Sequence, residues 1–229
     1  MEPRPPASSI VFLLSLVFLI SLFAFSPAGA AGKVGLYGIY MEPYGDDAKD
    51  YSRPGWGGGG RIVYPLPEVY QLLAGTAGLE FVNLMNETKK FKDSVTGLRT
   101  EQQTSQNYGR LYLGAEIGPH GGGFLRPYLG TNIAWSFYWI DTDVVIPDDS
   151  FRENEIRQDL ESEWSHAFGW DVTLGADLNF SNRFPVDVGV RFIKSFDVPQ
   201  QLGDDSEKIH PEYFQVFLGV GFSLAALGG

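Results

Sequence analysis

The sequence predicts an all-β fold, an eight-stranded antiparallel up-and-down transmembrane β-barrel. Eight segments alternate apolar with small or polar residues, and the connections between them alternate between short and long. No apolar run after Phe25 has the length of a membrane helix, so a chain that spans a membrane must do so as a closed barrel. An aromatic content of 14%, with 28 glycines and little helical periodicity, also indicates β structure.

The first thirty residues predict a secretory signal peptide. Residues 10–25 form an apolar run without a charge, shorter than the roughly 20 residues that a membrane-spanning helix needs. Small residues follow, with Ala28 and Ala30 at the spacing that a signal peptidase recognises. We expect cleavage after Ala30, which leaves residues 31–229 as one barrel domain. A retained membrane-anchoring helix is the alternative.

The strands that follow the signal peptide begin with three weakly alternating segments, at about 34–43, 56–64 and 74–85. In the third, Leu79 and Phe81 alternate with Gly78 and Glu80. Five later segments alternate more strongly: 108–117, 125–139, 168–180, 186–192 and 214–224. Because successive side chains of a strand point to opposite faces, each segment has one apolar and one small or polar face.

The connections between the predicted strands differ in length in a regular way. The short ones are 65–73, 118–123 and 181–184, and the long polar ones are 44–55, 86–104, 140–163 and 197–210. If both termini are periplasmic, the short turns face the periplasm and the long loops face the outside. Membrane barrels show this asymmetry.

The polar face of the strands carries charges of both signs, and these are predicted to point into the barrel: Glu80, Arg110, Glu116, Arg126, Asp171, Asp177, Asp187 and Arg191. The lumen of an eight-stranded barrel is only wide enough to be filled by side chains. Buried charges in such a lumen must be paired, because their desolvation is costly. We therefore expect a plug of salt bridges, with a conducting pore as the alternative.

Aromatic residues gather where one predicted strand ends and the next begins. Four tryptophans define this predicted aromatic girdle: Trp135, Trp139, Trp164 and Trp170. Rings with an apolar body and a polar edge prefer the level of the lipid headgroups. The girdle is therefore expected at the outer membrane–water interface.

Four stretches carry a family resemblance: VGLYGIY at 34–40, GWGGGGRIVY at 55–64, YLGTNIAW at 128–135 and GVGFSL at 219–224. The chain resembles the small eight-stranded outer-membrane β-barrel superfamily. This group includes the transmembrane domain of outer-membrane protein A and the outer membrane protein beta-barrel domain proteins. The resemblance implies an outer-membrane location, reached by the secretory pathway and the barrel-assembly machinery. The closing strand looks like the assembly signal, although residues 225–229 continue beyond it.

Composition and motifs argue against several functions. The absence of cysteine excludes a disulfide scaffold, a thiol enzyme and a lipid-anchored lipoprotein, and the net charge of −11 argues against a nucleic-acid partner. The lipid A deacylases, which resemble this fold, carry a His-x-Ser pair, and none of the three histidines here has a serine two residues later. Ser165 and His166 are adjacent and would point to opposite faces of a strand. We expect neither an enzyme nor a cofactor.

The predicted loop 141–163 is strongly acidic. It holds nine carboxylates against only Arg152 and Arg157. Oxygen-rich loops can bind Ca²⁺ or Mg²⁺, and such ions could bridge to lipopolysaccharide. The candidate metal ligands are Asp141, Asp143, Asp148 and Asp149. Solvated loop charge is the alternative.

These features together predict a structural or interaction protein of the outer membrane. We expect a porin-like monomer that contacts outer-membrane lipid and lipopolysaccharide and presents four extracellular loops. Two alternatives remain open: binding of a divalent cation or an envelope ligand through the acidic loop, and a narrow channel for solutes.

Overall fold

The structure is a computed structural model, and it describes residues 32–66, 72–92, 99–120, 123–146, 156–180, 184–202 and 205–223. The predicted signal peptide, residues 1–30, lies outside the described residues. Among those described, no helix is both long enough and apolar enough to cross a membrane.

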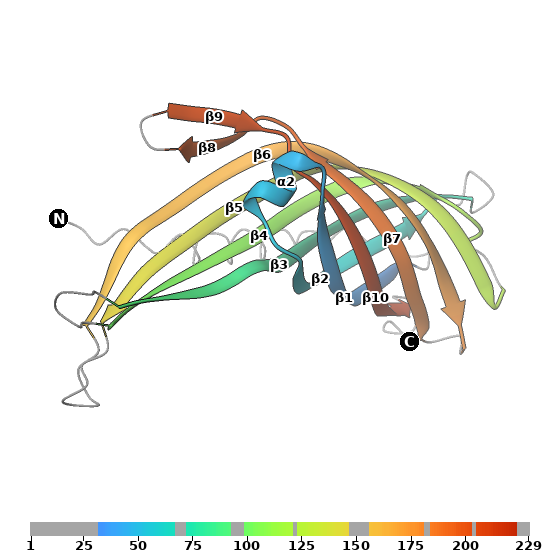
Figure 1. Cartoon of the computed structure of the whole chain (residues 1–229). Coiled ribbons are helices and arrows are strands. Elements are labelled where there is room, and N and C mark those ends of the chain that lie inside the picture. The colour runs from blue at the N-terminus through green and yellow to red at the C-terminus, as the bar shows by residue number, and fades with distance from the viewer. Residues whose placement is uncertain are drawn as a thin grey trace, which may run out of the picture.

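Eight antiparallel strands close into a barrel in which each strand pairs with its neighbours along the chain (Figure 1). They are β1 (Lys33–Tyr44), β2 (Gly55–Pro65), β3 (Leu73–Lys92), β4 (Arg99–Ile117), β5 (Leu125–Ile146), β6 (Ile156–Asn179), β7 (Pro185–Ser195) and β10 (Glu212–Ser223). The first and last strands complete the ring, with Lys33 opposite Ser223 and Tyr44 opposite Glu212. The predicted fold class is therefore confirmed.

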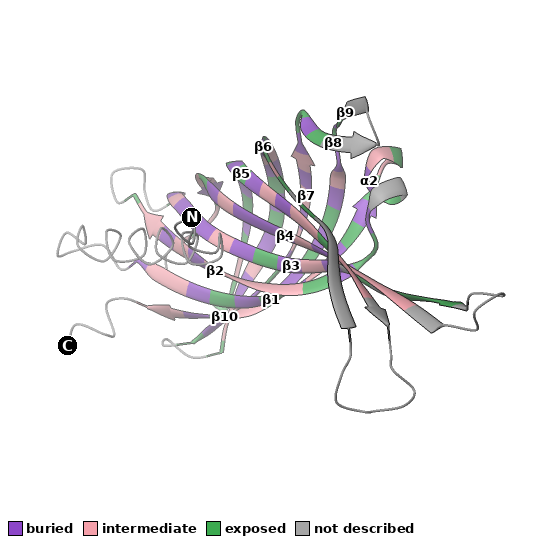
Figure 2. Cartoon of the chain, turned by 90° about the vertical axis from the view of Figure 1, so that its left-hand side faces the viewer, coloured by how far each residue is buried: buried purple, intermediate pink, exposed green. Residues whose placement is uncertain are grey.

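Alternating side chains give this barrel a polar inside and an apolar outside, and Figure 2 shows the alternation along the strands. On the outside, Ile133 is 70% exposed and Leu218 is 61% exposed, whereas Arg110 on the inside is 1% exposed. An apolar outer surface around a closed hydrogen-bonded ladder is the arrangement that a lipid bilayer demands.

Four strands continue past the closed barrel. β2 pairs with β3 only as far as Asn83, and β7 pairs with β6 only from Gly169 onward. Beyond these points β3, β4, β5 and β6 still pair with one another, and β4 pairs with β5 out to Glu101 opposite Val145. They form a four-stranded extension at one end of the molecule (Figure 1).

The prediction of loops at 86–104 and 140–163 is wrong for most of their described residues, which form strands of the extension. The physical reason is the solvent. Where both faces of a sheet can meet water, pairing of the backbone can continue without an apolar–polar alternation.

The other two predicted long loops also contain regular structure. Residues 44–55 include the short helix α2 (Asp46–Tyr51), and residues 197–210 include the hairpin β8 (Val198–Leu202) and β9 (Asp205–Ile209). These two strands pair with each other and not with the barrel. Both elements follow strand ends on the same side as the extension, and we call them together the cap (Figure 1).

Candidate functional site

The centre of the lumen holds four charges that come from four strands. Glu80 on β3 pairs with Arg191, which reaches across the lumen from β7, and Arg110 on β4 pairs with Asp171 on β6. Two longer contacts join the pairs: Arg110 Nε lies 3.4 Å from Glu80 Oε2, and Arg191 Nε lies 3.6 Å from Asp171 Oδ1. The four side chains are at most 1% exposed. We call this set the central cluster.

Neutral side chains add hydrogen bonds to the central cluster. The Tyr37 hydroxyl donates to Glu80 Oε1 at 2.7 Å, and the Gln215 amide bridges Glu80 and Arg191 at 3.2 and 3.1 Å. Asn132 Nδ2 donates to Asp171 Oδ1 at 2.7 Å. These neutral donors add to the ion pairs of both carboxylates, and such bonds offset part of the cost of burying the charges.

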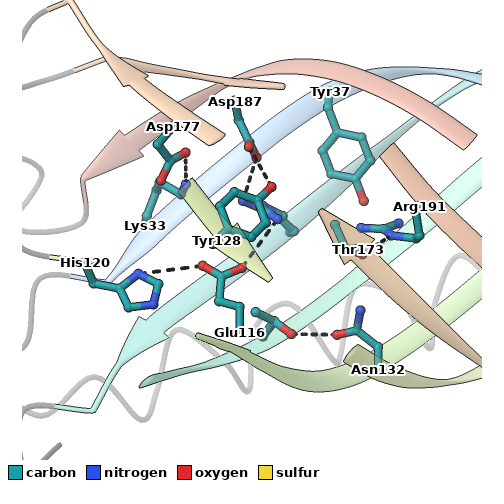
Figure 3. Close-up of polar contacts among 12 residues, drawn as sticks. Lys33, Tyr37, Glu116, His120, Tyr128, Asn132, Thr173, Asp177, Asp187 and Arg191 are labelled. Carbon is teal, nitrogen blue, oxygen red and sulfur yellow. Dashed lines mark hydrogen bonds and ion pairs between the residues drawn. The ribbon is translucent and has the colours of Figure 1, made fainter. Parts of the chain in front are cut away.

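A second set of charges lies nearer the end of the barrel where β1 begins and β10 ends (Figure 3). Arg61 Nη2 lies 2.6 Å from Asp187 Oδ2, and Arg61 Nη1 lies 3.6 Å from Glu116 Oε2. The Tyr128 hydroxyl donates to Asp187 at 2.8 Å. Tyr128 also stacks its ring against the Arg61 guanidinium, with 4.8 Å to the ring centroid.

Further pairs close this end of the lumen. Lys33 pairs with Asp177, and Arg126 Nη2 lies 3.3 Å from the same carboxylate. His120, in the turn between β4 and β5, places Nδ1 3.7 Å from Glu116 Oε1. Burial lowers the pKa of the His120 imidazole below its ordinary value, which favours the neutral ring at neutral pH. Three cations and three carboxylates therefore balance here, and we call them the lower cluster.

All eight charges that the sequence predicts for the lumen point inward, seven of them in buried residues and Arg126 at the mouth. Two inward cations were missed, Arg61 and Lys33. Arg61 follows the glycine run 57–60, which has no apolar–polar contrast, and Lys33 is the first residue of its strand. Val63, two positions after Arg61, is also buried. The inner face of this strand therefore carries both a charged and an apolar residue, and an apolar–polar alternation does not identify it.

A layer of three buried tyrosines lies between the central cluster and the cap. Tyr108 packs against Tyr138 and Tyr213, with ring centroids 5.1 and 5.6 Å apart. Each hydroxyl meets a buried serine: Tyr108 meets Ser136 at 3.1 Å, Tyr138 meets Ser195 at 2.8 Å, and Tyr213 meets Ser52 at 3.1 Å. Ser52 ends α2, so this last bond fastens the cap to the barrel.

Side chains thus fill the described lumen at three levels. Paired charges form two of these levels, and the tyrosine layer forms the third. Above the tyrosines, the cap residues Ala48, Val198 and Ile209 are buried in the same apolar cluster as Tyr138 and Tyr213. This arrangement can hold the strands in register, but it leaves little room for a wide water-filled path.

The predicted girdle residues lie on the outer face of β5 and β6. Trp135 and Trp164 are exposed, and Trp139 and Trp170 are half-buried. Trp135 stacks on Phe168 with centroids 5.8 Å apart. A second group of rings lies at the opposite end of the strands: Phe124 contacts Phe180 at 5.4 Å, and Phe184 contacts Phe222 at 5.5 Å.

Two of the four candidate metal ligands, Asp141 and Asp143, lie within the described residues. Asp141 and Asp143 lie two residues apart on one side of β5, and Asp141 Oδ1 accepts a hydrogen bond from Ser162 at 2.9 Å. Asp148 and Asp149 lie outside the described residues. Across the part of the chain that is described, no three His, Asp or Glu side chains gather as metal ligands would.

Comparison with known proteins identifies the architecture. No protein-family model matches the sequence, and no curated protein is significantly similar to it. Among solved structures, Neisserial surface protein A aligns with a TM-score of 0.54 at 12% identity, over 86% of this chain and 99% of that one.

Two other outer-membrane structures align less closely. A major outer membrane protein from Thermus thermophilus gives a TM-score of 0.49 at 14% identity, over 85% of this chain and 100% of that one. Ail, the attachment invasion locus protein of Yersinia pestis, gives 0.43 at 12% identity, over 85% and 97%. Together with the closed ring of eight strands, the alignment to Neisserial surface protein A gives the chain the fold of the small eight-stranded outer-membrane β-barrels.

Proposed function

We propose that this protein is an outer-membrane barrel with a structural or interaction role, which presents its cap and its four-stranded extension to the outside. The observation that carries the proposal is the filled lumen, because paired charges and tyrosines occupy it at three levels. A barrel packed in this way leaves its projecting end as the part that can meet partners. Both barrel termini would then face the periplasm.

The proposal includes the route and the surroundings of the protein. Residues 1–30 would direct it into the secretory pathway, and the barrel-assembly machinery would insert residues 31–229 as a monomer. Support comes from the exposed apolar outer surface and from the two groups of rings at its opposite ends. Such rings suit contact with lipid and lipopolysaccharide at the two interfaces.

We infer a non-catalytic role. Ser165 lines the space beneath the cap, whereas its neighbour His166 lies outside against Trp135 and Trp164, at 5.8 and 5.3 Å between ring centroids. A serine and a histidine on opposite faces of one strand cannot exchange a proton.

Heat-modifiability in outer-membrane fractions tests this proposal. Closed barrels resist detergent, so the unboiled protein should migrate differently on a gel from the boiled protein. We expect this shift in the outer-membrane fraction, with a mature N-terminus at Ala31. Soluble periplasmic protein without a shift would contradict the proposal.

A second candidate function is cation binding by the acidic segment, favoured by the placement of Asp141 and Asp143 on one side of β5. Calcium titration by calorimetry should then give a saturable signal that Asp141→Asn with Asp143→Asn abolishes. Asp46→Asn, which removes an exposed carboxylate from α2, is the matched control. Equal calcium signals from the unaltered protein, the double variant and the control would exclude cation binding at Asp141 and Asp143.

A further inference from the structure

A small cavity lies directly beneath the cap. Its volume is about 30 Å³, which is room for about two water-sized groups. Two rings of the tyrosine layer, Tyr138 and Tyr213, form its floor, α2 and the β8–β9 hairpin form its roof, and inward residues of β4, β5 and β6 form one wall. The lining residues are Asp47, Ser52, Gln106, Tyr138, Ile140, Ser165, Val198, Pro199, Ile209, Pro211 and Tyr213.

One buried acceptor of this cavity has no partner. Gln106 is 4% exposed, and its amide oxygen has no hydrogen bond within the described structure. The hydroxyls of the two lining tyrosines have other partners, because Tyr138 donates to Ser195 and Tyr213 pairs with Ser52. A buried amide oxygen is costly to leave unpaired, so the cavity favours a guest that donates a hydrogen bond.

The charge around the cavity selects the kind of donor. Asp47 supplies a carboxylate, whose Oδ2 accepts the backbone N–H of His210 at 2.8 Å. No Lys or Arg is among the lining residues, and two aromatic rings, Tyr138 and Tyr213, are among them, which can attract a cation placed over a ring face. The net charge of −11 also raises the concentration of small cations near the protein.

Four apolar lining residues, Ile140, Val198, Pro199 and Ile209, lie on the side of β5 and the hairpin, and we call them the rim. Val198 and Ile209 are buried, Ile140 is half-buried, and Pro199 is exposed. A ligand can therefore place a water-sized polar group inside and rest a hydrophobic body on Ile140 and Pro199.

We propose that this cavity is a binding site for a small organic amine. The ammonium group donates to the Gln106 amide oxygen and lies near Asp47 and the tyrosine rings. The apolar part of the amine packs on the rim. This site is separate from the central cluster and the lower cluster. The ligand binds between the cap and the tyrosine layer.

The test uses three probes of one shape: 2-phenylethylamine, its neutral analogue 2-phenylethanol and its anionic analogue phenylacetate. Each is titrated by calorimetry into the full barrel in lipid nanodiscs, with empty nanodiscs to subtract partition into lipid. We expect saturable binding of the amine, at least tenfold weaker binding of the alcohol, and none of the acid.

Substitutions then locate the binding. Gln106→Leu keeps the side-chain size, removes the acceptor and should weaken amine binding about tenfold or more. Gln103→Leu, on the opposite face of the same strand, should bind as the unaltered protein does. Asp47 lies on α2, outside the barrel wall. The Asp47→Asn variant should bind the amine more weakly but the alcohol equally well.

Several results would overturn the site. If none of the three probes saturates, the Gln106 oxygen is satisfied by water alone. Equal binding of amine and alcohol, or amine binding that survives both Gln106→Leu and Asp47→Asn, would also refute it. The heat-dependent gel shift checks that each variant folds, and Asp47→Asn decides the matter if Gln106→Leu does not fold.

Discussion

At the scale of single residues, the buried charges are the most sensitive part of the molecule. Glu80 accepts hydrogen bonds from Arg191, Tyr37 and Gln215, and it forms a longer ion pair with Arg110, all within the lumen. Removing one partner leaves a charge without compensation where water is excluded. Stability therefore depends on complete pairing more than on any one bond.

Arg191→Met tests this dependence. The change keeps most of the side-chain volume but leaves one cation, Arg110, between the two carboxylates of Glu80 and Asp171, so the free energy of unfolding should fall by about 3–5 kcal/mol. Urea unfolding of the barrel in lipid vesicles measures it. The control is Lys194→Met on the same strand, whose partly exposed pair with Glu212 should contribute at most about 1 kcal/mol. Equal losses in the two variants would contradict a special role for the central cluster.

Glycine at one inner position makes room for a tyrosine. A Cβ at Gly78 would lie 2.5 Å from the ring of Tyr112 and 2.6 Å from the Gly60 carbonyl oxygen, whereas a Cβ at Gly75 would meet nothing within 4 Å. Gly78→Ala should therefore destabilise the barrel by about 1–3 kcal/mol through overpacking.

Gly75→Ala, three residues away on β3, is the matched control and should be neutral or slightly stabilising. The same urea unfolding experiment compares the two variants. A Gly78→Ala barrel as stable as the unaltered one would show that Tyr112 can move aside.

At the scale of elements, strand length is the main difference between prediction and structure. β3, β4, β5 and β6 have 20, 19, 22 and 24 residues, although about 9–11 residues suffice to cross a membrane. The outer halves of these strands pair only with one another, so they form a sheet that projects beyond the barrel.

The hairpin of the cap should be dispensable for closure of the barrel. β8 and β9 pair only with each other, while β7 pairs directly with β10 from Glu212 to Val220. Replacing residues 198–209 by a short Gly-Ser linker should therefore keep the heat-dependent gel shift. It should also increase hydrogen exchange in the tyrosine layer, because the hairpin covers Tyr138 and Tyr213. Loss of the gel shift would mean that the hairpin is needed to assemble the ring.

At the scale of the whole molecule, the filled lumen predicts a barrel that does not conduct ions. In planar lipid bilayers the unaltered protein should show no regular conductance steps, because the paired charges and the tyrosines occupy its axis. The double variant Glu80→Ser with Arg191→Ser removes the pair that bridges opposite walls, and its conductance should be higher. Regular steps from the unaltered protein would favour the narrow-channel alternative instead.

Much of this architecture was predictable from the chain alone, for a physical reason. Lipid on one side and a packed lumen on the other force a period of two, so the pattern around Leu125–Trp139 predicts both a strand and its orientation. The same pattern predicts which charges point inward, including Arg110 and Asp171.

Only the tertiary structure decided which charges meet and what closes the outer end. Pairs such as Glu80 with Arg191 depend on register and curvature across 111 residues, and alternation carries no information on either. The glycine run hid Arg61 because it has no contrast between its faces. The extension and the cap lie where both faces can meet water, so pairing and packing, not hydrophobic pattern, determine their structure.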